Sequence, residues 1–212
     1  MEKFQNKYRI ETTRLKNWDY GSNAMYFITI CTKNRAHYFG DIAIVETRNV
    51  VETDNHPSLR NTTNGTVETQ YFASLSQNRP SLQATEIGNI AYQYWTNIPK
   101  HFPFVELDEF IIMPNHIHGI LFINKAQAQD FASPRQPNKF GPQSKNLGSI
   151  IRGYKAGVKT FATTNKIEFE WQPRYYDHII KSENDLITIR KYIQNNPMNW
   201  EKDKNNHESL TI

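Results

Sequence analysis

The apolar residues of the chain fall into short runs, and their spacing alternates between that of strands and that of helices. Residues 25–32 (MYFITICT), 105–113 (VELDEFIIM) and 116–123 (HIHGILFI) are rich in aromatic and β-branched side chains, which predicts three strands. Only a Pro-Asn step separates the second run from the third, so these two are expected to form a hairpin. Residues 175–181 predict a further short strand, and residues 42–45 another.

Three longer segments carry apolar side chains three to four positions apart, which is the spacing of an amphipathic helix. They are residues 85–99, 147–163 and 183–196, and Pro197 ends the third. The main order is strand, helix, two strands, helix, strand, helix. It predicts an α+β domain of the ferredoxin-like or RRM-like kind, with an antiparallel sheet, helices on one face and an additional C-terminal helix.

Two polar stretches interrupt this pattern. Residues 46–83 are rich in Asn, Thr, Ser, Glu and Gln, and residues 124–146 are polar with three prolines. We interpret both as insertions into a single domain that spans residues 1–200. Residues 201–212 are a polar tail, and fraying is expected from residue 198 onward.

Composition and charge indicate the class of partner and the cellular compartment to expect. The chain has 25 basic and 21 acidic residues, a net charge of +4 that leans mildly toward anionic partners. Its one cysteine, Cys31, cannot form a disulfide within the chain and suits a reducing compartment. The N-terminus lacks the apolar core of a signal peptide, and no apolar run approaches the roughly 18 residues of a membrane helix. A cytoplasmic protein without a membrane partner is expected.

His116 and His118 are polar residues inside an apolar strand. Side chains two positions apart on a strand point to the same face, with Cα atoms roughly 7 Å apart, so both imidazoles can converge on one cation. Such a site needs a further donor from another part of the chain. The alternative is a pair of hydrogen-bonded core histidines without a ligand.

Tyr192 and Asn196 lie four positions apart in the last predicted helix, so they share one face. A tyrosine hydroxyl is a nucleophile when deprotonated, and its ordinary pKa is about 10. The side-chain oxygen of Asn196 is a suitable hard ligand for Mg²⁺ or Mn²⁺. The alternatives are a partly buried helix aromatic and a C-terminal cap before proline.

Several of these segments together resemble a known family. The motifs MPNHIHGI, RYYDHII and YIQNNP resemble those of the REP-associated tyrosine transposases, relatives of the single-tyrosine insertion-sequence transposases in the HUH endonuclease superfamily. YFITICTKNR with HYFG, and LGSIIRGYKAGV, agree with this family in the same order along the chain. The resemblance covers roughly residues 8–45 and 85–200.

The resemblance implies a reaction and a set of site residues. His116 and His118 match the paired metal ligands, Tyr192 matches the nucleophile, and Asn196 stands where a polar side chain completes the metal site. The family's tyrosine attacks single-stranded DNA, typically at hairpins formed by palindromic repeats. A 5′-phosphotyrosine link forms and a 3′-hydroxyl leaves, with Mg²⁺ or Mn²⁺ and without a nucleotide cofactor. A monomer is favoured over a dimer.

Further residues are candidate contacts to DNA. Arg152, Lys155 and Lys159 share one face of a predicted helix and are expected to hold phosphates. Tyr154 is a candidate for stacking on unpaired bases, although core packing is an alternative. His178 lies in an apolar strand, where it either contacts a phosphate, orients the site, or is a hydrogen-bonded strand histidine.

Other functions remain open at this point. One is a DNA-hairpin-binding module that has lost cleavage, which the intact His116, His118 and Tyr192 oppose. Another is a replication initiator or relaxase of the same superfamily, which the small domain disfavours. A nucleotide hydrolase of the histidine-triad type would need a further alternating histidine, and position 120 is Ile.

Overall fold

The fold below comes from a computed structural model. It describes residues 3–4, 7–8, 15, 18–44, 80–125, 144–203 and 205–206. Most of both predicted insertions therefore lies outside the described residues.

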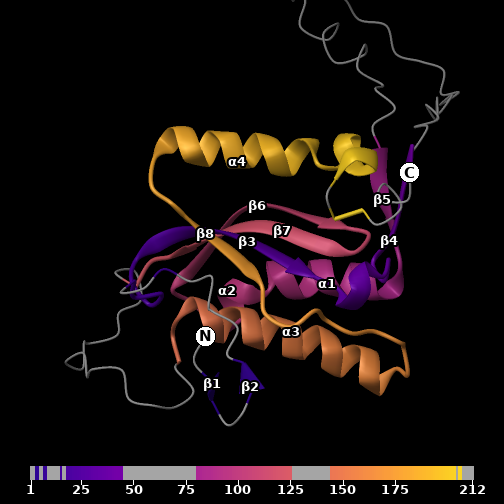
Figure 1. Ribbon diagram of the computed structural model, residues 1–212, viewed down its shortest axis with the longest axis horizontal. Coiled ribbons are helices and arrows are strands. Elements are labelled where there is room, and N and C mark those ends of the chain that lie inside the picture. Colours follow the sequence, from indigo (N-terminus) through magenta and orange to yellow (C-terminus); the bar gives the residue numbers. More distant parts are fainter. Residues whose placement is uncertain are drawn as a thin grey trace, which may run out of the picture.

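A four-stranded antiparallel sheet forms the centre of the molecule (Figure 1). Its strands are β3 (Ala24–Cys31), β6 (Val105–Met113), β7 (His116–Ile123) and β8 (Tyr176–Ile180), in the order β6-β7-β3-β8. This order, with the first and third strands of the chain in the middle, is that of a ferredoxin-like sheet. The predicted α+β class and the predicted hairpin are confirmed, because β6 pairs directly with β7 across a two-residue turn.

Helices cover both faces of this sheet. Figure 1 shows α1 (Glu86–Thr96), α2 (Ile98–His101) and α3 (Leu147–Thr164) on one side and α4 (Glu183–Asn195) on the other. Side-chain hydrogen bonds cap the N-termini of the three longer helices; the capping residues are Thr85, Asn146 and Ser182. Within the described part of the chain, no helix has the length and apolar character needed to cross a membrane.

Two smaller sheets flank the domain. β4 (Gly40–Ile44) pairs with β5 (Pro80–Ala84), and β1 (Lys3–Phe4) pairs with β2 (Lys7–Tyr8). A short 3₁₀ helix, η1 (Lys33–Arg35), follows β3. The predicted insertion is therefore shorter at its C-terminal side than expected, since its last residues form β5.

The sheet separates a large core from a small one. On the α1–α3 face, alternate residues of the central strands pack with fully buried helix side chains such as Trp95, Val158 and Ile150. On the α4 face, the small core consists of Phe27, Ile120, Ile180 and Ile193. This alternation follows from the two-residue period of a strand.

The segment after α4 is ordered, contrary to the expectation of a frayed tail from residue 198. Pro197–Lys202 form a 3₁₀ helix, η2, in which Trp200 is buried. The polar residues that follow are buried too, including Asp203 and Asn205. Trp200 packs next to the ring of His116 and so holds this polar segment against the sheet.

Gly119, between His118 and Ile120 on β7, has no room for a side chain. A Cβ atom there would lie 2.3 Å from Cζ2 of Trp95, which is fully buried. We expect Gly119→Ala to lower the free energy of unfolding by about 1–3 kcal/mol, measured by urea denaturation, because the indole must move. Gly153→Ala on α3 is the control, since its Cβ would make an ordinary 3.4 Å contact with Phe102. Equal urea midpoints for the wild type and Gly119→Ala would contradict this account.

Candidate active site

Both histidines of the β7 pair point to the α4 face of the sheet. Their Cα partners on β3 are Cys31 for His116 and Thr29 for His118. Both imidazoles are buried, and their ring centroids are 4.5 Å apart. The predicted convergence of the two rings is therefore present in the structure.

Hydrogen bonds to Nδ1 orient each ring. His116 Nδ1 lies 2.9 Å from Asn115 Oδ1, while the amide nitrogen of Asn115 donates to the carbonyl oxygens of Arg35 and Asn205. An amide oxygen only accepts, so His116 Nδ1 carries a proton, and in the neutral form of the ring the lone pair is on Nε2. His118 Nδ1 lies 2.9 Å from Thr29 Oγ1. Such bonds are typical of metal-ligating histidines, whose other nitrogen is held by a polar group.

Asp203 completes a three-residue cluster with these histidines. Ligand atoms of His116, His118 and Asp203 all lie within 4.8 Å of one another, and all three residues are buried. Asp203 Oδ2 lies 4.0 Å from His116 Nε2. The carboxylate is oriented by the backbone N–H of Asn205, which donates to Oδ1 at 2.7 Å, and by Asn196 Nδ2, which donates to Oδ2 at 3.2 Å.

This cluster can hold a divalent cation. Two imidazole nitrogens and one carboxylate oxygen form a donor set that suits divalent first-row metals. The side-chain oxygen of Asn196, Oδ1, is buried and accepts no hydrogen bond from the described residues. Asn196 thus lies beside the cluster, where its amide nitrogen faces Asp203, and its role as a metal ligand stays a prediction.

Tyr192 brings a hydroxyl to the edge of the cluster. Its oxygen lies 3.1 Å from His118 Nε2, and the residue is 41% exposed. Burial raises the pKa of the Tyr192 phenol above its ordinary value, and the charge of Asp203 adds to this, while a hydrogen bond from Asn196 lowers the pKa. The hydroxyl is therefore protonated at neutral pH.

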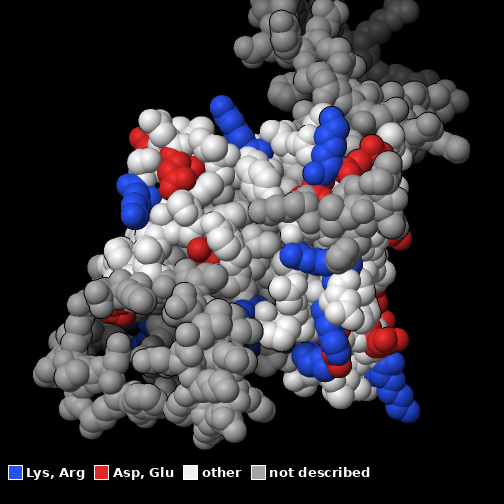
Figure 2. All heavy atoms as spheres, viewed as in Figure 1, with Lys and Arg blue, Asp and Glu red and all other residues white. Residues whose placement is uncertain are grey.

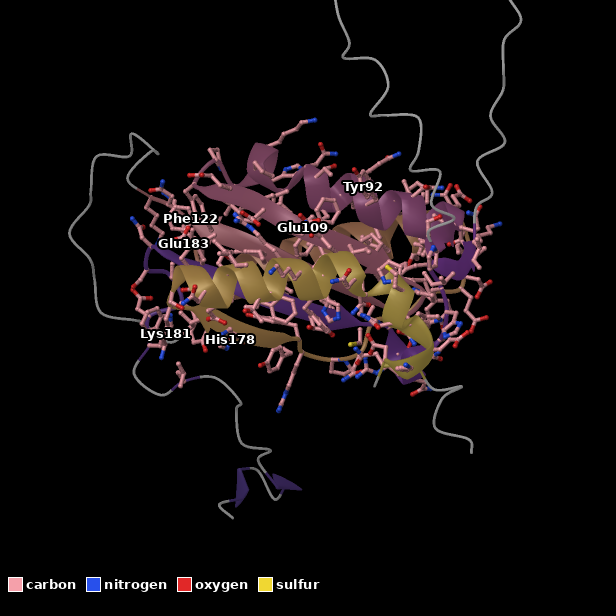
Figure 3. All side chains as sticks on the ribbon, turned by 90° about the horizontal axis from the view of Figure 1, so that it is seen from above. Tyr92, Glu109, Phe122, His178, Lys181 and Glu183 are labelled. Carbon is pink, nitrogen blue, oxygen red and sulfur yellow. The ribbon has the colours of Figure 1, made fainter. Side chains whose placement is uncertain are left out.

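Helix α4 is fixed to the sheet on both sides of Tyr192. Ile193 is fully buried in the small core. Arg190 makes a two-pronged ion pair with Asp108 of β6, with Nε 2.8 Å from Oδ1, and this pair lowers the pKa of the Asp108 carboxyl. Gln194 donates to Glu109 at 3.1 Å, and Figure 3 shows Glu109 beside the helix. These contacts set the rotation of α4 that turns Tyr192 toward His118.

Two of the three basic residues of α3 that were predicted to hold phosphates donate hydrogen bonds to backbone carbonyl oxygens of the protein. Lys155 Nζ donates to two carbonyl oxygens of the 172–174 segment, at 2.6 and 3.0 Å. Lys159 Nζ donates to the Phe169 carbonyl at 2.6 Å. Both ammonium groups thus attach the segment before β8 to α3. Arg152 is exposed on the same helix. Phosphate binding by these three residues stays a prediction.

The structure places the other two predicted DNA contacts differently. Tyr154 is 4% exposed and its hydroxyl donates to the Ala91 carbonyl, so its ring is part of the large core. His178 lies on β8, where its Nε2 is 2.9 Å from Asp185 Oδ2. Figure 3 shows His178 near the start of α4. A role in orienting the site agrees with this position, since Asp185 belongs to the first turn of α4.

Further basic side chains follow the β8 side of the molecule. Figure 2 shows Lys and Arg side chains one after another from the end where α4 meets η2 down toward α3. Arg174, just before β8, and Lys191, next to Tyr192, are both exposed. Neither was among the predicted contacts, and both lie close in sequence to parts of the candidate site.

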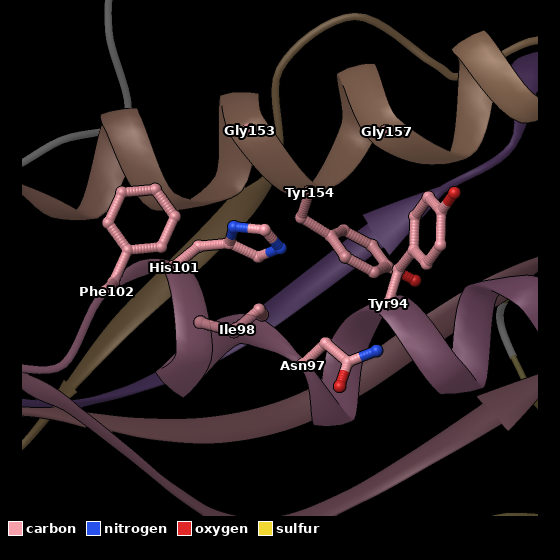
Figure 4. Close-up of a pocket in the computed structure, with 8 residues that line it drawn as sticks. All are labelled: Tyr94, Asn97, Ile98, His101, Phe102, Gly153, Tyr154 and Gly157. Atoms are coloured by element: carbon pink, nitrogen blue, oxygen red, sulfur yellow. The ribbon is translucent and has the colours of Figure 1, made fainter.

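A separate cavity lies on the opposite side of the sheet. It has a volume of about 470 Å³ and lies between α1–α2 and α3, where Tyr94, Phe102 and Gly157 are part of its wall (Figure 4). Because α1, α2 and α3 cover the face opposite α4, this cavity is not part of the histidine cluster.

Sequence patterns missed Asp203, Asn115 and Thr29. Asp203 follows Tyr192 in a polar stretch and has no regular spacing from the histidines. The available signal was Trp200, because a lone large aromatic residue in a polar segment indicates that the segment packs on the domain. Asn115 was interpreted only as a turn residue, yet its side chain holds both His116 and the backbone of Asn205.

No protein-family model matches the chain. An uncharacterized protein of Haemophilus influenzae is 37% identical over 198 residues, covering 90% of this chain and 89% of that protein. Among solved structures, a REP-associated tyrosine transposase bound to a REP hairpin is 15% identical with a TM-score of 0.47, over 90% of this chain and 74% of that chain. A candidate transposase of Deinococcus radiodurans is 13% identical with a TM-score of 0.37, over 87% and 97%. At these levels of structural likeness, we take the function from the geometry of the site.

Proposed function

The chain belongs to the same protein family as the Haemophilus influenzae protein, and we propose that it is a metal-dependent endonuclease and strand transferase of the REP-associated tyrosine transposase kind. The proposed substrate is single-stranded DNA folded into a hairpin at a palindromic repeat. Tyr192 is the proposed nucleophile, and His116, His118 and Asp203 are the proposed metal ligands.

The observation that carries this proposal is the distance between a tyrosine hydroxyl and the histidine pair. Tyr192 Oη lies 3.1 Å from His118 Nε2, beside a carboxylate that faces His116. A structural tyrosine would be expected to bury its ring, but this one is 41% exposed while its hydroxyl faces the cluster. Nucleophile and charge-stabilising group lie together, as attack on a phosphodiester requires.

In the proposed reaction, the Tyr192 oxygen attacks the phosphorus of a phosphodiester. The bond from phosphorus to the 3′ oxygen breaks, so a 5′-phosphotyrosine and a free 3′-hydroxyl result, and the phenol proton balances the proton gained by the leaving oxygen. A divalent cation bound at the cluster supplies stabilisation of the negative charge on the phosphate. Attack by another 3′-hydroxyl reverses these steps and joins strands without a nucleotide cofactor.

The donor set favours Mn²⁺ over Mg²⁺ as the proposed metal. Imidazole nitrogen is a softer ligand than the oxygen donors that Mg²⁺ prefers, and the cluster has two imidazoles for one carboxylate. All three proposed ligands and the proposed nucleophile come from one chain. This supports the proposal of a monomer, because no partner residue is needed to bring Tyr192 to the histidines.

Removal of metal is expected to abolish covalent DNA attachment. The assay uses labelled oligonucleotides that carry the host's palindromic repeats with unpaired flanks, incubated with the protein in Mn²⁺, Mg²⁺ or EDTA. We expect an adduct stable in detergent that is labelled through the 3′ part of the cut strand, forms at lower Mn²⁺ than Mg²⁺, and is absent in EDTA. Tight hairpin binding without any cleavage would instead favour the cleavage-inactive binding module.

A further inference from the structure

We propose that Tyr176, supported by Phe27, forms a stacking platform for an unpaired nucleobase next to the scissile phosphate. This inference rests on the proposed function and specifies how that site receives its single strand. Tyr176 lies on β8, the edge strand nearest β3, and 54% of the residue is exposed.

The sheet register places Tyr176 in the same row as the candidate site. Tyr176 is the Cα partner of Thr29 on β3, and Thr29 is in turn the Cα partner of His118 on β7. Partners in antiparallel strands point to the same face of the sheet. Tyr176 is therefore on the α4 face, two strands and roughly 10 Å from His118.

Phe27 connects Tyr176 to the nucleophile. Its ring centroid lies 6.4 Å from that of Tyr176 and 6.1 Å from that of Tyr192, with edge-on geometry in both cases. The same ring stacks on His118 at 5.3 Å. The four rings form a continuous aromatic cluster, in which Phe27 and His118 are buried and Tyr176 and Tyr192 are exposed.

The exposure of Tyr176 distinguishes it from an ordinary core aromatic. An edge-on contact with Phe27 leaves much of the Tyr176 ring uncovered, although burial of an aromatic side chain is favourable. Bases of a single strand stack on such rings irrespective of sequence, with about 1–3 kcal/mol per base. The exposed cations Arg174 and Lys191 lie two residues before Tyr176 and directly before Tyr192, and they suit the phosphates on either side of a base.

A strand bound in this way places one base on Tyr176 while the adjoining phosphate approaches the Tyr192 hydroxyl. The platform would thus fix the position of the cut relative to the hairpin without reading the base identity. It explains why an apolar ring is exposed on the same row as the buried His118.

The test measures binding of hairpin oligonucleotides with 2-aminopurine at each unpaired flanking position in turn, in EDTA so that no cleavage occurs. We expect quenching of one flanking 2-aminopurine by the wild type, and loss of this quenching in Tyr176→Ala with about 5- to 150-fold weaker binding. Tyr176→Phe is expected to bind as the wild type does. Tyr92→Ala is the matched control, because Tyr92 is also 54% exposed but packs on Phe110 and belongs to α1 on the other face.

Tyr176→Leu separates stacking from packing, because leucine retains apolar contact with Phe27 but has no aromatic face. Wild-type binding and quenching in Tyr176→Leu or Tyr176→Ala would overturn the platform, while an adduct formed by the wild type would still support the proposed function. Weak binding by Tyr176→Leu with unchanged thermal unfolding supports the platform. If the wild type neither binds these hairpins nor forms an adduct, the proposed function fails and the platform with it.

Discussion

Tyr192→Phe is expected to form no covalent adduct with hairpin DNA under conditions where the wild type does. The substitution removes one oxygen atom, the one that lies 3.1 Å from His118 Nε2. The ring contacts with His118 and Phe27 remain, so the variant should fold, bind DNA and bind metal as the wild type does. Denaturing gels with end-labelled oligonucleotides measure the adduct, and calorimetry with Mn²⁺ measures the metal site.

Tyr92→Phe is the control for this substitution, because it removes the hydroxyl of another exposed tyrosine, which lies on α1 on the opposite face of the sheet. It should form the wild-type amount of adduct. An undiminished adduct in Tyr192→Phe would show that another side chain is the nucleophile, and peptide mapping of the linked DNA would then identify it.

Asp203→Asn is expected to weaken Mn²⁺ binding by at least about 100-fold, since loss of groups that merely orient metal ligands already costs about 10- to 100-fold. The substitution removes the only negative charge in the three-residue cluster while keeping its shape. Asn196→Ala should have a smaller effect of about tenfold, because Asn196 Nδ2 donates to Asp203 and thereby orients the carboxylate. Calorimetric titration with Mn²⁺ measures both variants without reference to cleavage.

The comparison of these two variants decides between the ligand that the sequence predicted and the one that the structure suggests. Asp41→Asn is the control, since Asp41 is an exposed carboxylate outside the cluster. If Asn196→Ala loses more Mn²⁺ affinity than Asp203→Asn, then the Asn196 oxygen is the third ligand and Asp203 has a secondary role.

Local patterns were sufficient to predict the fold of the central domain. The aromatic and β-branched runs that became β3 and β7, and the three-to-four spacing of α1, α3 and α4, are properties of short stretches of sequence. The starts of α1 and α4 are also set locally, because the side chains of Thr85 and Ser182 accept hydrogen bonds from backbone N–H groups only three residues later. The histidine pair could be predicted for the same reason, since residues two positions apart on a strand point to the same face.

Contacts between residues far apart in the sequence could not be predicted from such patterns. Lys155 and Lys159 have the spacing of an exposed basic helix face, yet their ammonium groups are used by backbone carbonyls more than nine residues away. Asp203 joins the histidines only because η2 turns the chain back over the sheet. No pattern within one element specifies where a later segment docks. Asp203, the third member of the cluster and its acidic residue, could therefore be identified only from the structure.

The unequal size of the two cores has a consequence for local stability. The sheet and helices α1 to α3 share the large core. In the small core, one buried side chain of α4, Ile193, packs on three buried side chains of the sheet, and α4 is also held by surface contacts such as Arg190–Asp108. Regions with few buried apolar contacts open at lower free energy than the remainder of a domain. We therefore expect α4, which carries the proposed nucleophile, to open at a lower free energy than the sheet and helices α1 to α3.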